Sequence, residues 1–194
     1  MEKVFVCDLD DVVIDLSSQI SKDMHDSHGI LVPKEDWFYF DFRQYLPLER
    51  KDIFKVILER DSLQRALPFC DSKDFLDEFK NSDIKLFIVT SRSWHKNAMS
   101  ETERYFEKNK LHNDKIIISQ AGVDKSEYLK KIAEQYEIVG FVDDNVNNIK
   151  GALGIVDNIY IKNNPWNKHY NNNAVKRVFD LESVAKDLKR KKII

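Results

Sequence analysis

Three carboxylates follow an apolar run near the start of the chain. The stretch VFVCDLDDVV places Asp8, Asp10 and Asp11 within four positions, directly after four apolar residues. A carboxylate held beside a divalent cation stays ionised at neutral pH and can attack a phosphorus atom, which forms an aspartyl phosphate. A second carboxylate two positions later can protonate the leaving oxygen and then draw a proton from water. The pattern therefore favours phosphoryl transfer with Asp8 and Asp10 as the reactive pair.

Polar residues also end two later apolar runs. VTSR supplies Thr90, Ser91 and Arg92, and FVDDN supplies Asp143 and Asp144. In an open parallel sheet the crevice lies beyond the carboxyl ends of the strands, so residues far apart in sequence meet there. The residues expected to converge are Asp8, Asp10, Thr90, Asp143 and Asp144.

The predicted cluster of carboxylates needs a cation. Carboxylates that face one another repel and raise each other's pKa values. The ligand atoms here are all oxygens, and the five histidines are scattered without metal-ligand spacing. Oxygen ligands without histidine or cysteine favour Mg²⁺ over zinc or copper. We therefore expect a Mg²⁺ site.

A lysine for the transferred phosphoryl group is available in QAGVDKSEYLKK. Asp124 is a predicted helix N-cap with Glu127 three positions later, which places Lys125 in the first helical turn, where the helix dipole also favours an anion. We expect Lys125 to neutralise the phosphoryl group and the hydroxyl of Thr90 to donate a hydrogen bond to it. The alternative is that Lys125 is a solvated surface charge.

Five short apolar runs are the predicted strands that position these residues. Between the later runs, apolar residues recur at three- and four-residue steps, which predicts amphipathic helices. Alternating strands and helices are typical of a doubly wound α/β domain with a parallel sheet. The predicted strands are Val4–Cys7, Ile84–Val89, Lys115–Ile118, Ile138–Val142 and Ile155–Ile161.

Residues 15–68 hold helical spacing but no convincing strand. Leu16, Ile20 and Met24 are spaced by four residues, and a second helical face is formed by Ile53, Phe54, Ile57 and Leu58. We therefore predict a small helical cap over 15–68, inserted into a core domain made of 1–14 and 69–194. The Asn-rich stretch 163–173 is predicted to be a surface loop.

Aromatic residues are concentrated in DWFYFDF, within the predicted cap. Trp37, Phe38, Tyr39, Phe40 and Phe42 lie within six consecutive positions. A ring that faces the crevice could stack on a nucleobase, and Trp37, Phe38 and Phe40 are the predicted substrate contacts of this segment. The alternative is that these rings form the core that anchors the cap to the domain.

Two residues of VTSR are also predicted to bind substrate. Ser91 and Arg92 follow the second strand and would face the same crevice. Arg92 could clamp a phosphate or a carboxylate with two parallel hydrogen bonds, or it could pair with a surface acid. The residue types leave both interpretations open.

The motifs DLDDVV, VTSR, the lysine that opens a helix, and FVDDN resemble the four motifs of the haloacid dehalogenase (HAD) superfamily, in their usual order from residue 4 to about 150. This resemblance implies a Rossmann-like core. It implies Asp8 as the nucleophile, Asp10 as the general acid and base, and Thr90 and Lys125 as the residues that bind the phosphoryl group.

The same resemblance implies the metal ligands. They would be Asp8, the backbone carbonyl of Asp10, and Asp143 or Asp144. The sequence departs from the pattern at Asp11, which stands where many members of the superfamily carry glycine. Within the superfamily, the small cap and the stretch NNPWNKHY resemble the 5′(3′)-deoxyribonucleotidases and their bacterial and phage relatives.

These observations predict a Mg²⁺-dependent phosphomonoester hydrolase whose substrate is a nucleoside or deoxynucleoside monophosphate. Two other readings remain. The same chemistry could act on a sugar phosphate or on the 3′-phosphate end of a nucleic acid. A binding or regulatory module could have kept the fold and lost turnover, although both Asp8 and Asp10 are present.

The composition excludes several classes of protein. Thirty-three acidic and thirty-one basic residues give a net charge of −2, so strong binding to nucleic-acid polymers is not expected. No apolar run is long enough to span a bilayer, and MEKVFVCDLD lacks the pattern of a signal peptide. Two distant cysteines, Cys7 and Cys70, give no support for a disulfide framework. We expect a cytoplasmic protein without a membrane partner, with a homodimer as one option for its oligomeric state.

Overall fold

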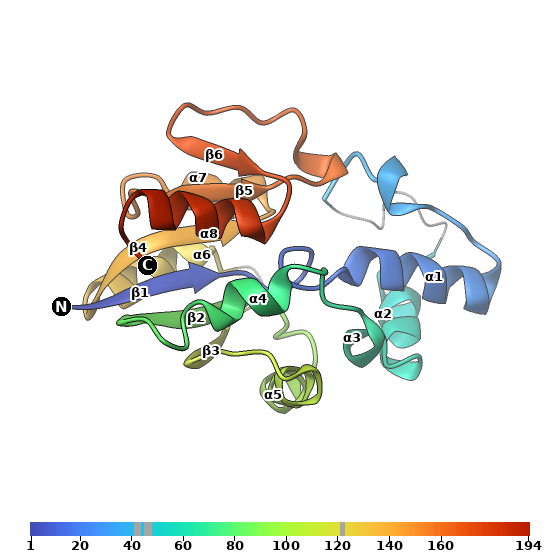
Figure 1. Ribbon diagram of the computed structural model, residues 1–194. Coiled ribbons are helices and arrows are strands. Elements are labelled where there is room, and N and C mark those ends of the chain that lie inside the picture. The colour runs from blue at the N-terminus through green and yellow to red at the C-terminus, as the bar shows by residue number, and fades with distance from the viewer. Residues whose placement is uncertain (41–43, 45–47, 121–122) are drawn as a thin grey trace.

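A parallel sheet of six strands forms the centre of the molecule (Figure 1). The computed structural model describes residues 1–40, 44, 48–120 and 123–194, so Phe42 of the predicted aromatic segment lies outside the described residues. The strand order is β3-β2-β1-β4-β5-β6, and every neighbouring pair is parallel. The strands are β1 (Glu2–Cys7), β2 (Ile84–Thr90), β3 (Lys115–Ile118), β4 (Tyr136–Asp143), β5 (Ile159–Lys162) and β6 (Val175–Val178). The predicted α/β class with a parallel sheet is therefore confirmed.

Helices cover both faces of the sheet, which is the doubly wound arrangement. Strand β1 sends Phe5 and Cys7 into one hydrophobic cluster and Val4 and Val6 into the other. The first cluster includes side chains of α4 (Ser72–Asp77), α5 (Ala98–Asn109) and α8 (Leu181–Arg190). The second includes side chains of α6 (Lys125–Ala133) and α7 (Val146–Ala152). A strand buried on both faces explains why the apolar runs are continuous and do not alternate.

All five predicted strands are present, and one strand is added. Only Lys115–Ile118 has both predicted ends, three strands are longer by one to three residues, and the fifth begins later than predicted. The fifth strand begins at Ile159, because the N–H groups of Ile155 and Val156 donate to the carbonyl of Ala152 in a turn that follows α7. Strand β6 was not predicted. Its sequence VKRV places two basic residues in its middle, which a strand tolerates at the edge of a sheet, where β6 lies.

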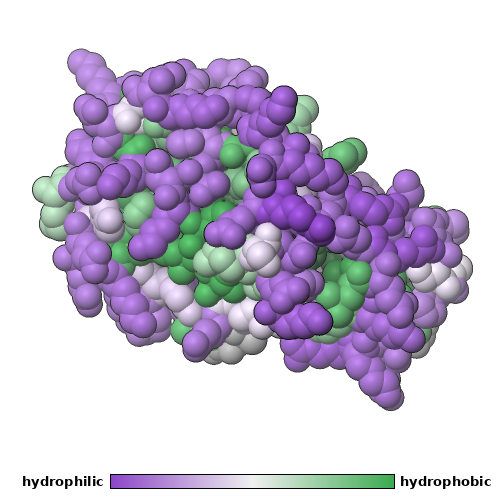
Figure 2. Space-filling model, turned by 90° about the horizontal axis from the view of Figure 1, so that it is seen from below, coloured by the Kyte–Doolittle hydropathy of each residue, from purple (hydrophilic) through white to green (hydrophobic). Residues whose placement is uncertain are grey.

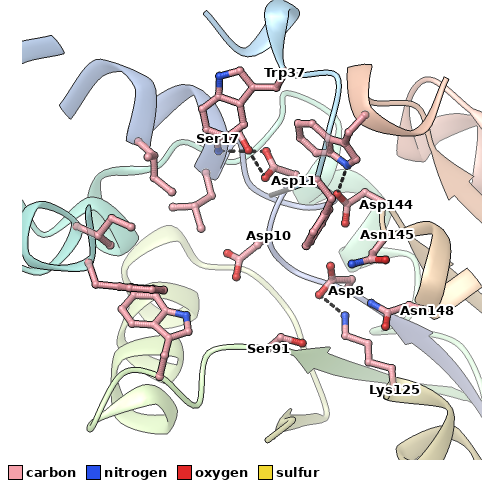
Figure 3. Close-up of a pocket in the computed structure, with 17 residues that line it drawn as sticks. Asp8, Asp10, Asp11, Ser17, Trp37, Ser91, Lys125, Asp144, Asn145 and Asn148 are labelled. Carbon is pink, nitrogen blue, oxygen red and sulfur yellow. Dashed lines mark hydrogen bonds and ion pairs between the residues drawn. The ribbon is translucent and has the colours of Figure 1, made fainter. Parts of the chain in front are cut away.

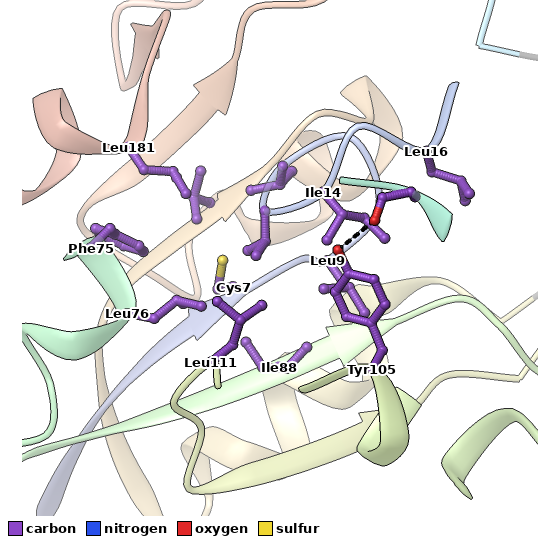
Figure 4. Close-up of a cluster of buried hydrophobic side chains, with 14 of the residues drawn as sticks. Cys7, Leu9, Ile14, Leu16, Phe75, Leu76, Ile88, Tyr105, Leu111 and Leu181 are labelled. Atoms are coloured by element: carbon purple, nitrogen blue, oxygen red, sulfur yellow. Dashed lines mark hydrogen bonds between the residues drawn. The ribbon is translucent and has the colours of Figure 1, made fainter. Parts of the chain in front are cut away.

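The first hydrophobic cluster continues from the sheet to the helices of residues 15–68 (Figure 4). Leu9, Ile14 and Leu16 are buried in it beside residues of the sheet and of α5. The hydroxyl of Tyr105 in α5 donates a 2.8 Å hydrogen bond to the carbonyl of Ala66. This bond links α5 to the end of residues 15–68. Apolar packing therefore links the sheet to the segment that overhangs its carboxyl edge.

The helical elements whose bounds are described in residues 15–68 gather beyond the carboxyl ends of the central strands, on the right of Figure 1. They are α1 (Leu16–His28), η1 (Lys34–Asp36), α2 (Arg50–Glu59) and α3 (Ser62–Arg65). The two connections to the rest of the chain lie side by side, since Ile14 and Pro68 form an antiparallel bridge.

The predicted apolar faces of α1 and α2 are largely buried. Leu16, Ile20 and Met24 of α1 are buried, and Ile57 of α2 is buried with them. Leu58, predicted on the same face, is instead half exposed. It is the next residue after Ile57, and successive helical residues point in different directions.

The surface is mostly hydrophilic when seen from the α5 side (Figure 2). Hydrophobic residues gather on the larger part of the molecule and in a recess beside the smaller lobe. Among the helices of the described residues, none combines the length and the apolar character that a bilayer span requires.

Asp187 of α8 joins this helix to the outer strands, and its removal is expected to lower stability. Its buried carboxylate accepts a 2.9 Å hydrogen bond from the hydroxyl of Tyr160 and pairs with Lys176, Arg190 and Lys191. Because the three cations are substantially exposed, the buried tyrosine bond should dominate. We expect Asp187→Ala to lower the free energy of unfolding by about 1–3 kcal/mol, since Tyr160 loses its acceptor. Urea denaturation measures this change.

The pH dependence of that difference has a defined sign. Burial alone would raise the pKa of Asp187, but hydrogen bonds from Lys176, Lys191 and Tyr160 outweigh burial and hold the pKa below its usual range. A folded-state pKa below the unfolded value stabilises the protein above the unfolded value, about pH 4, and the contribution is lost as the pH falls through the folded value. The difference in the free energy of unfolding between the wild type and Asp187→Ala should therefore become smaller in acid. Glu182→Ala, on the same helix at a carboxylate that pairs with exposed Lys186, is the control. A difference in the free energy of unfolding that stays constant down to the pH of acid denaturation would show that the ionised carboxylate of Asp187 does not stabilise the fold.

Candidate active site

The loop after β1 presents three carboxylates at the carboxyl edge of the sheet, those of Asp8, Asp10 and Asp11. The carbonyl of Leu9 accepts hydrogen bonds from the N–H groups of Val12, Val13 and Ile14, so the chain turns back at once. Asp11 has φ +59°, the left-handed conformation that favours glycine. The turn buries Leu9 and its apolar partners and leaves Asp8 and its neighbours to face a cavity.

Three buried carboxylates from the ends of β1 and β4 meet at this edge. Asp8, Asp143 and Asp144 each offer an oxygen, and these oxygens lie within 4.8 Å of one another. Lys125, the first residue of α6, places its Nζ 2.6 Å from Asp8 Oδ1 and 2.8 Å from Asp143 Oδ2. Asp124 caps this helix by accepting from the N–H of Ser126, as predicted. Lys125 is 2% exposed, so it is not a solvated surface charge.

The three buried carboxylates repel one another, so a positive charge among them would stabilise the cluster. Burial raises the pKa of Asp8 to about 7, although the attraction of Lys125 acts in the opposite direction. Burial raises the pKa of Asp144 well above its usual value, and repulsion from Asp143 and Asp8 adds to the effect. Burial alone would lower the pKa of Lys125, but the attraction of Asp143 and Asp8 raises it. One ammonium cannot neutralise three carboxylates, and an all-oxygen donor set of this kind fits Mg²⁺.

The carboxylate of Asp143 is fixed by the start of α7. Its Oδ1 accepts from the backbone N–H of Asn145 at 2.8 Å, and both of its oxygens lie 3.1 Å from Asn148 Nδ2. Figure 3 shows Asn145 and Asn148 beside Asp8, Lys125 and the carboxylate of Asp144. These asparagines were not predicted from the sequence, although each follows FVDD within four residues.

Asp10 is held apart from the three buried carboxylates by Arg92. The Nε and Nη2 of Arg92 donate to the two oxygens of Asp10 at 3.0 and 2.5 Å, which is a bidentate pair. The hydroxyl of Thr90 donates to the same carboxylate at 3.3 Å. Arg92 was predicted to clamp substrate or to pair with a surface acid. In the structure its side chain is fully buried and does not line the cavity. Its guanidinium pairs with Asp10, and its Nη1 donates to the hydroxyl of Thr102.

If Asp10 is the general acid and base that the sequence predicts, Arg92→Lys should slow the hydrolysis of phosphate esters by misplacing it. A lysine keeps the charge but loses the planar fork that fixes both oxygens. A displacement of about 1 Å costs about 10²-fold in rate, so we expect a fall of that size in kcat. The loss should be larger for an alkyl phosphate than for p-nitrophenyl phosphate, because the nitrophenolate needs no proton as it leaves. Steady-state kinetics on the two esters measure the difference.

The matched control is Arg65→Lys. Arg65 pairs with buried Asp23 in residues 15–68, away from the cavity. An Arg92→Lys enzyme that loses the same factor on both esters would show that the pair serves folding and not proton transfer.

A cavity of about 270 Å³ opens onto the acid cluster (Figure 3). Its polar end holds Asp8, Asp10, Lys125 and Asp144. The remainder is lined mainly by apolar and aromatic side chains from residues 15–68 and from two loops of the sheet, namely Leu16, Ile20, Trp37, Phe40, Phe54, Ile57, Trp94 and Trp166. A ligand in this cavity would therefore place one charged end among the acids and an apolar part on the opposite wall.

The cavity contains some of the predicted substrate contacts but not all. Ser91, Trp37 and Phe40 line it. Phe38 does not, and its side chain is 63% exposed. Trp94 was missed by the sequence analysis. Its ring packs on Phe54 with the centroids 4.6 Å apart, and a tryptophan two residues after Arg92 was the only signal for it.

Asp11 joins the loop after β1 to residues 15–68. It accepts hydrogen bonds from the N–H and the hydroxyl of Ser17 at 3.1 and 2.5 Å. Lys34 Nζ lies 2.9 Å from Asp11 and 2.8 Å from Asp15. Burial raises the pKa of Asp11, and the attraction of Lys34 and the hydrogen bonds from Ser17 act in the opposite direction without cancelling the rise. The left-handed turn is thus held by its own side chain.

Comparisons with known proteins identify the fold. No protein-family model matches the sequence, and no curated protein matches it either. Solved structures do match along nearly the whole chain. A HAD-family hydrolase from Deinococcus radiodurans with bound phosphate and sodium has a TM-score of 0.67 at 13% identity and covers 98% of this chain and 96% of its own.

Two further structures agree with that match. A HAD-superfamily hydrolase of subfamily IA from Geobacter sulfurreducens has a TM-score of 0.62 at 15% identity, covering 97% of this chain and 100% of its own. The D,D-heptose 1,7-bisphosphate phosphatase from B. bronchiseptica, complexed with magnesium and phosphate, has a TM-score of 0.59 at 14% identity, covering 98% and 99%. At these identities the likeness establishes the fold, and the chain has that of HAD-superfamily hydrolases.

Proposed function

We propose that this chain is a Mg²⁺-dependent phosphomonoester hydrolase and that its substrates are nucleoside or deoxynucleoside monophosphates. The observation that carries the proposal is the meeting of Asp8, Asp143, Asp144 and Lys125 at one end of a cavity whose other end is apolar. The magnesium and phosphate named for the heptose bisphosphate phosphatase of the same fold support it.

The reaction would proceed in two displacements. The carboxylate of Asp8 attacks phosphorus, the bond from phosphorus to the ester oxygen breaks, and Asp10 gives its proton to that oxygen. Water then attacks the aspartyl phosphate, Asp10 accepts a proton from the water, and phosphate leaves with Asp8 restored. Arg92 and Thr90 would orient the ionised Asp10 that accepts the proton from water, because their contacts with its two oxygens are in place. The protonated Asp10 of the first displacement would have to turn its proton-bearing oxygen away from Arg92 and toward the ester oxygen.

Lys125 and the metal would share the neutralisation of charge. Asp8, with Asp143 or Asp144 and the backbone carbonyl of Asp10, would hold Mg²⁺, which supplies electrostatic stabilisation of the phosphoryl oxygens when bound. Lys125 lies between Asp8 and Asp143 and can donate to a phosphoryl oxygen from the same position. Residues 15–68 would act as a cap that limits the access of water to this end of the cavity.

The lining of the cavity favours a leaving group with a planar ring. Trp37, Phe40, Phe54, Trp94 and Trp166 offer stacking and apolar contact. A bare sugar would leave its hydroxyl groups facing these rings without hydrogen-bond partners, which costs free energy. This contrast supports a nucleotide over a sugar phosphate.

A panel of phosphomonoesters tests the proposal. Released phosphate is measured with nucleoside monophosphates, deoxynucleoside monophosphates and sugar phosphates, each with Mg²⁺ and with EDTA. We expect hydrolysis of the nucleotides only with Mg²⁺, and competition by nucleotides against p-nitrophenyl phosphate. Faster hydrolysis of the sugar phosphates would overturn the substrate assignment, and no phosphate release from any ester would favour a binding module.

A further inference from the structure

A segment between β5 and β6 braces the acid cluster. The stretch predicted to be a surface loop contains the short helix η3 (Pro165–Asn167), and Asn164, Trp166 and Asn167 are buried. The prediction is therefore wrong for these three residues, because each donates a hydrogen bond into the interior. We call residues 163–170 the bracket segment.

The bracket segment bonds to both loops that carry the acids. Asn164 Nδ2 donates to the carbonyl of Asp11 at 3.1 Å. Asn167 Nδ2 donates to the carbonyl of Asp144 at 2.8 Å, and Trp166 Nε1 donates to the side-chain Oδ2 of Asp144 at 2.9 Å. The loops after β1 and after β4 are thus both held by three side chains of one short segment.

Strand β6, which the sequence analysis missed, holds the bracket segment in turn. Nη1 of Arg177 donates to the side-chain oxygens of Asn163 and Asn167 at 3.0 and 2.8 Å. Its Nη2 donates to the carbonyls of Asn167 and Tyr170 at 2.9 and 2.6 Å. Four hydrogen bonds from one guanidinium fix the segment, so Trp166 reaches Asp144 from a rigid support.

We propose that Trp166 is a positioning residue for metal binding by Asp144. This inference rests on the metal site of the proposed function. The indole N–H holds Oδ2, while no hydrogen bond from the described residues reaches Oδ1, which leaves that oxygen for a cation. A neutral donor orients the carboxylate without cancelling its charge, whereas a lysine or arginine there would compete with the metal.

The same indole is a wall of the cavity. Its ring packs on Trp37 with the centroids 6.3 Å apart and meets Phe40 edge-on at 6.2 Å. Trp166 is 4% exposed, so its orientation is set by these rings on one side and by Asp144 on the other. The residue therefore joins the apolar end of the cavity to the metal end.

Trp166→Phe tests the role of the N–H, since phenylalanine keeps an aromatic ring but donates no hydrogen bond. Partners that orient metal ligands typically contribute 10- to 100-fold to affinity. We expect isothermal titration calorimetry to show Mg²⁺ binding weakened by about 10- to 100-fold. The Mg²⁺ concentration for half-maximal phosphate release should rise by the same factor.

Trp94→Phe is the matched control. Trp94 lines the same cavity and packs on Phe54, and it makes no hydrogen bond to the acids among the described residues. Its Mg²⁺ affinity should equal that of the wild type. Thermal unfolding in EDTA checks that both variants fold. If Trp166→Phe does not fold, 3-benzothienyl-alanine at position 166, which keeps the bicyclic shape and replaces the N–H by sulfur, gives the same comparison.

The outcomes separate this inference from the proposed function. Wild-type affinity for Mg²⁺ in the folded position-166 variant would overturn the role of Trp166 and leave the hydrolase proposal standing. Equal weakening in Trp94→Phe would also overturn it, because the effect would then belong to the cavity as a whole. Absence of Mg²⁺ binding by the wild-type protein would overturn both.

Discussion

Asp8→Asn is expected to abolish phosphate release, with a fall of at least about 10⁴-fold in kcat, because an amide cannot form the aspartyl phosphate. The replacement has nearly the same shape, and it removes one of three mutually repelling buried carboxylates. We therefore expect the variant to fold. Phosphate release from a nucleoside monophosphate with Mg²⁺ measures the loss, and circular dichroism with thermal unfolding measures the fold.

The control for this experiment is Asp74→Asn, which changes an exposed carboxylate on α4 away from the cavity. Its rate should match the wild type. A folded Asp8→Asn protein that hydrolyses the substrate within about tenfold of the wild-type rate would be incompatible with a covalent intermediate on Asp8.

Lys125→Met is expected to destabilise the protein in EDTA by about 3–5 kcal/mol, because it leaves buried charges without their partner. Lys125 contacts both Asp8 and Asp143 and is itself buried. Added Mg²⁺ should restore part of the loss, since an ion that binds only the folded state stabilises it by about 2.7 kcal/mol at a hundred times its Kd. Urea denaturation with EDTA and with Mg²⁺ measures both effects.

Activity should not recover with stability in this variant. The hydrogen bond from Lys125 to the phosphoryl group would be lost, and donors of this kind contribute about 10²- to 10³-fold to kcat. Lys130→Met, which removes an exposed lysine of the same helix that pairs with exposed Glu127, should change neither property. Equal stability of Lys125→Met and wild type in EDTA would show that the acid cluster does not depend on this ammonium.

The strands were predictable because a strand that is buried on both faces is a continuous run of apolar residues. Continuous apolar runs such as Val4–Cys7 became strands of the sheet, and the order of helices and strands predicted its parallel topology. Strand β6 shows no such run, because an edge strand with Lys176 and Arg177 at its centre reads as polar surface.

The sequence predicted which residues meet at the candidate site, but not how their side chains are oriented. Residues at the carboxyl ends of parallel strands must share an edge, which brought Asp8, Asp143 and Asp144 together in the sequence argument. The pairing of Arg92 with Asp10 depends on the rotamers of two side chains from neighbouring strands, and no spacing rule specifies rotamers. The burial of Trp166 likewise depends on contacts with distant loops.

The central claim is that carboxylates from the ends of β1 and β4 bind one divalent cation. Anomalous diffraction from crystals grown with Mn²⁺, an ion that accepts the same oxygen ligands as Mg²⁺, tests it most directly. The account predicts an anomalous peak about 2.0–2.2 Å from oxygen atoms of Asp8 and of Asp143 or Asp144. Crystals of protein that is active with Mn²⁺ but shows no peak among these residues would contradict it.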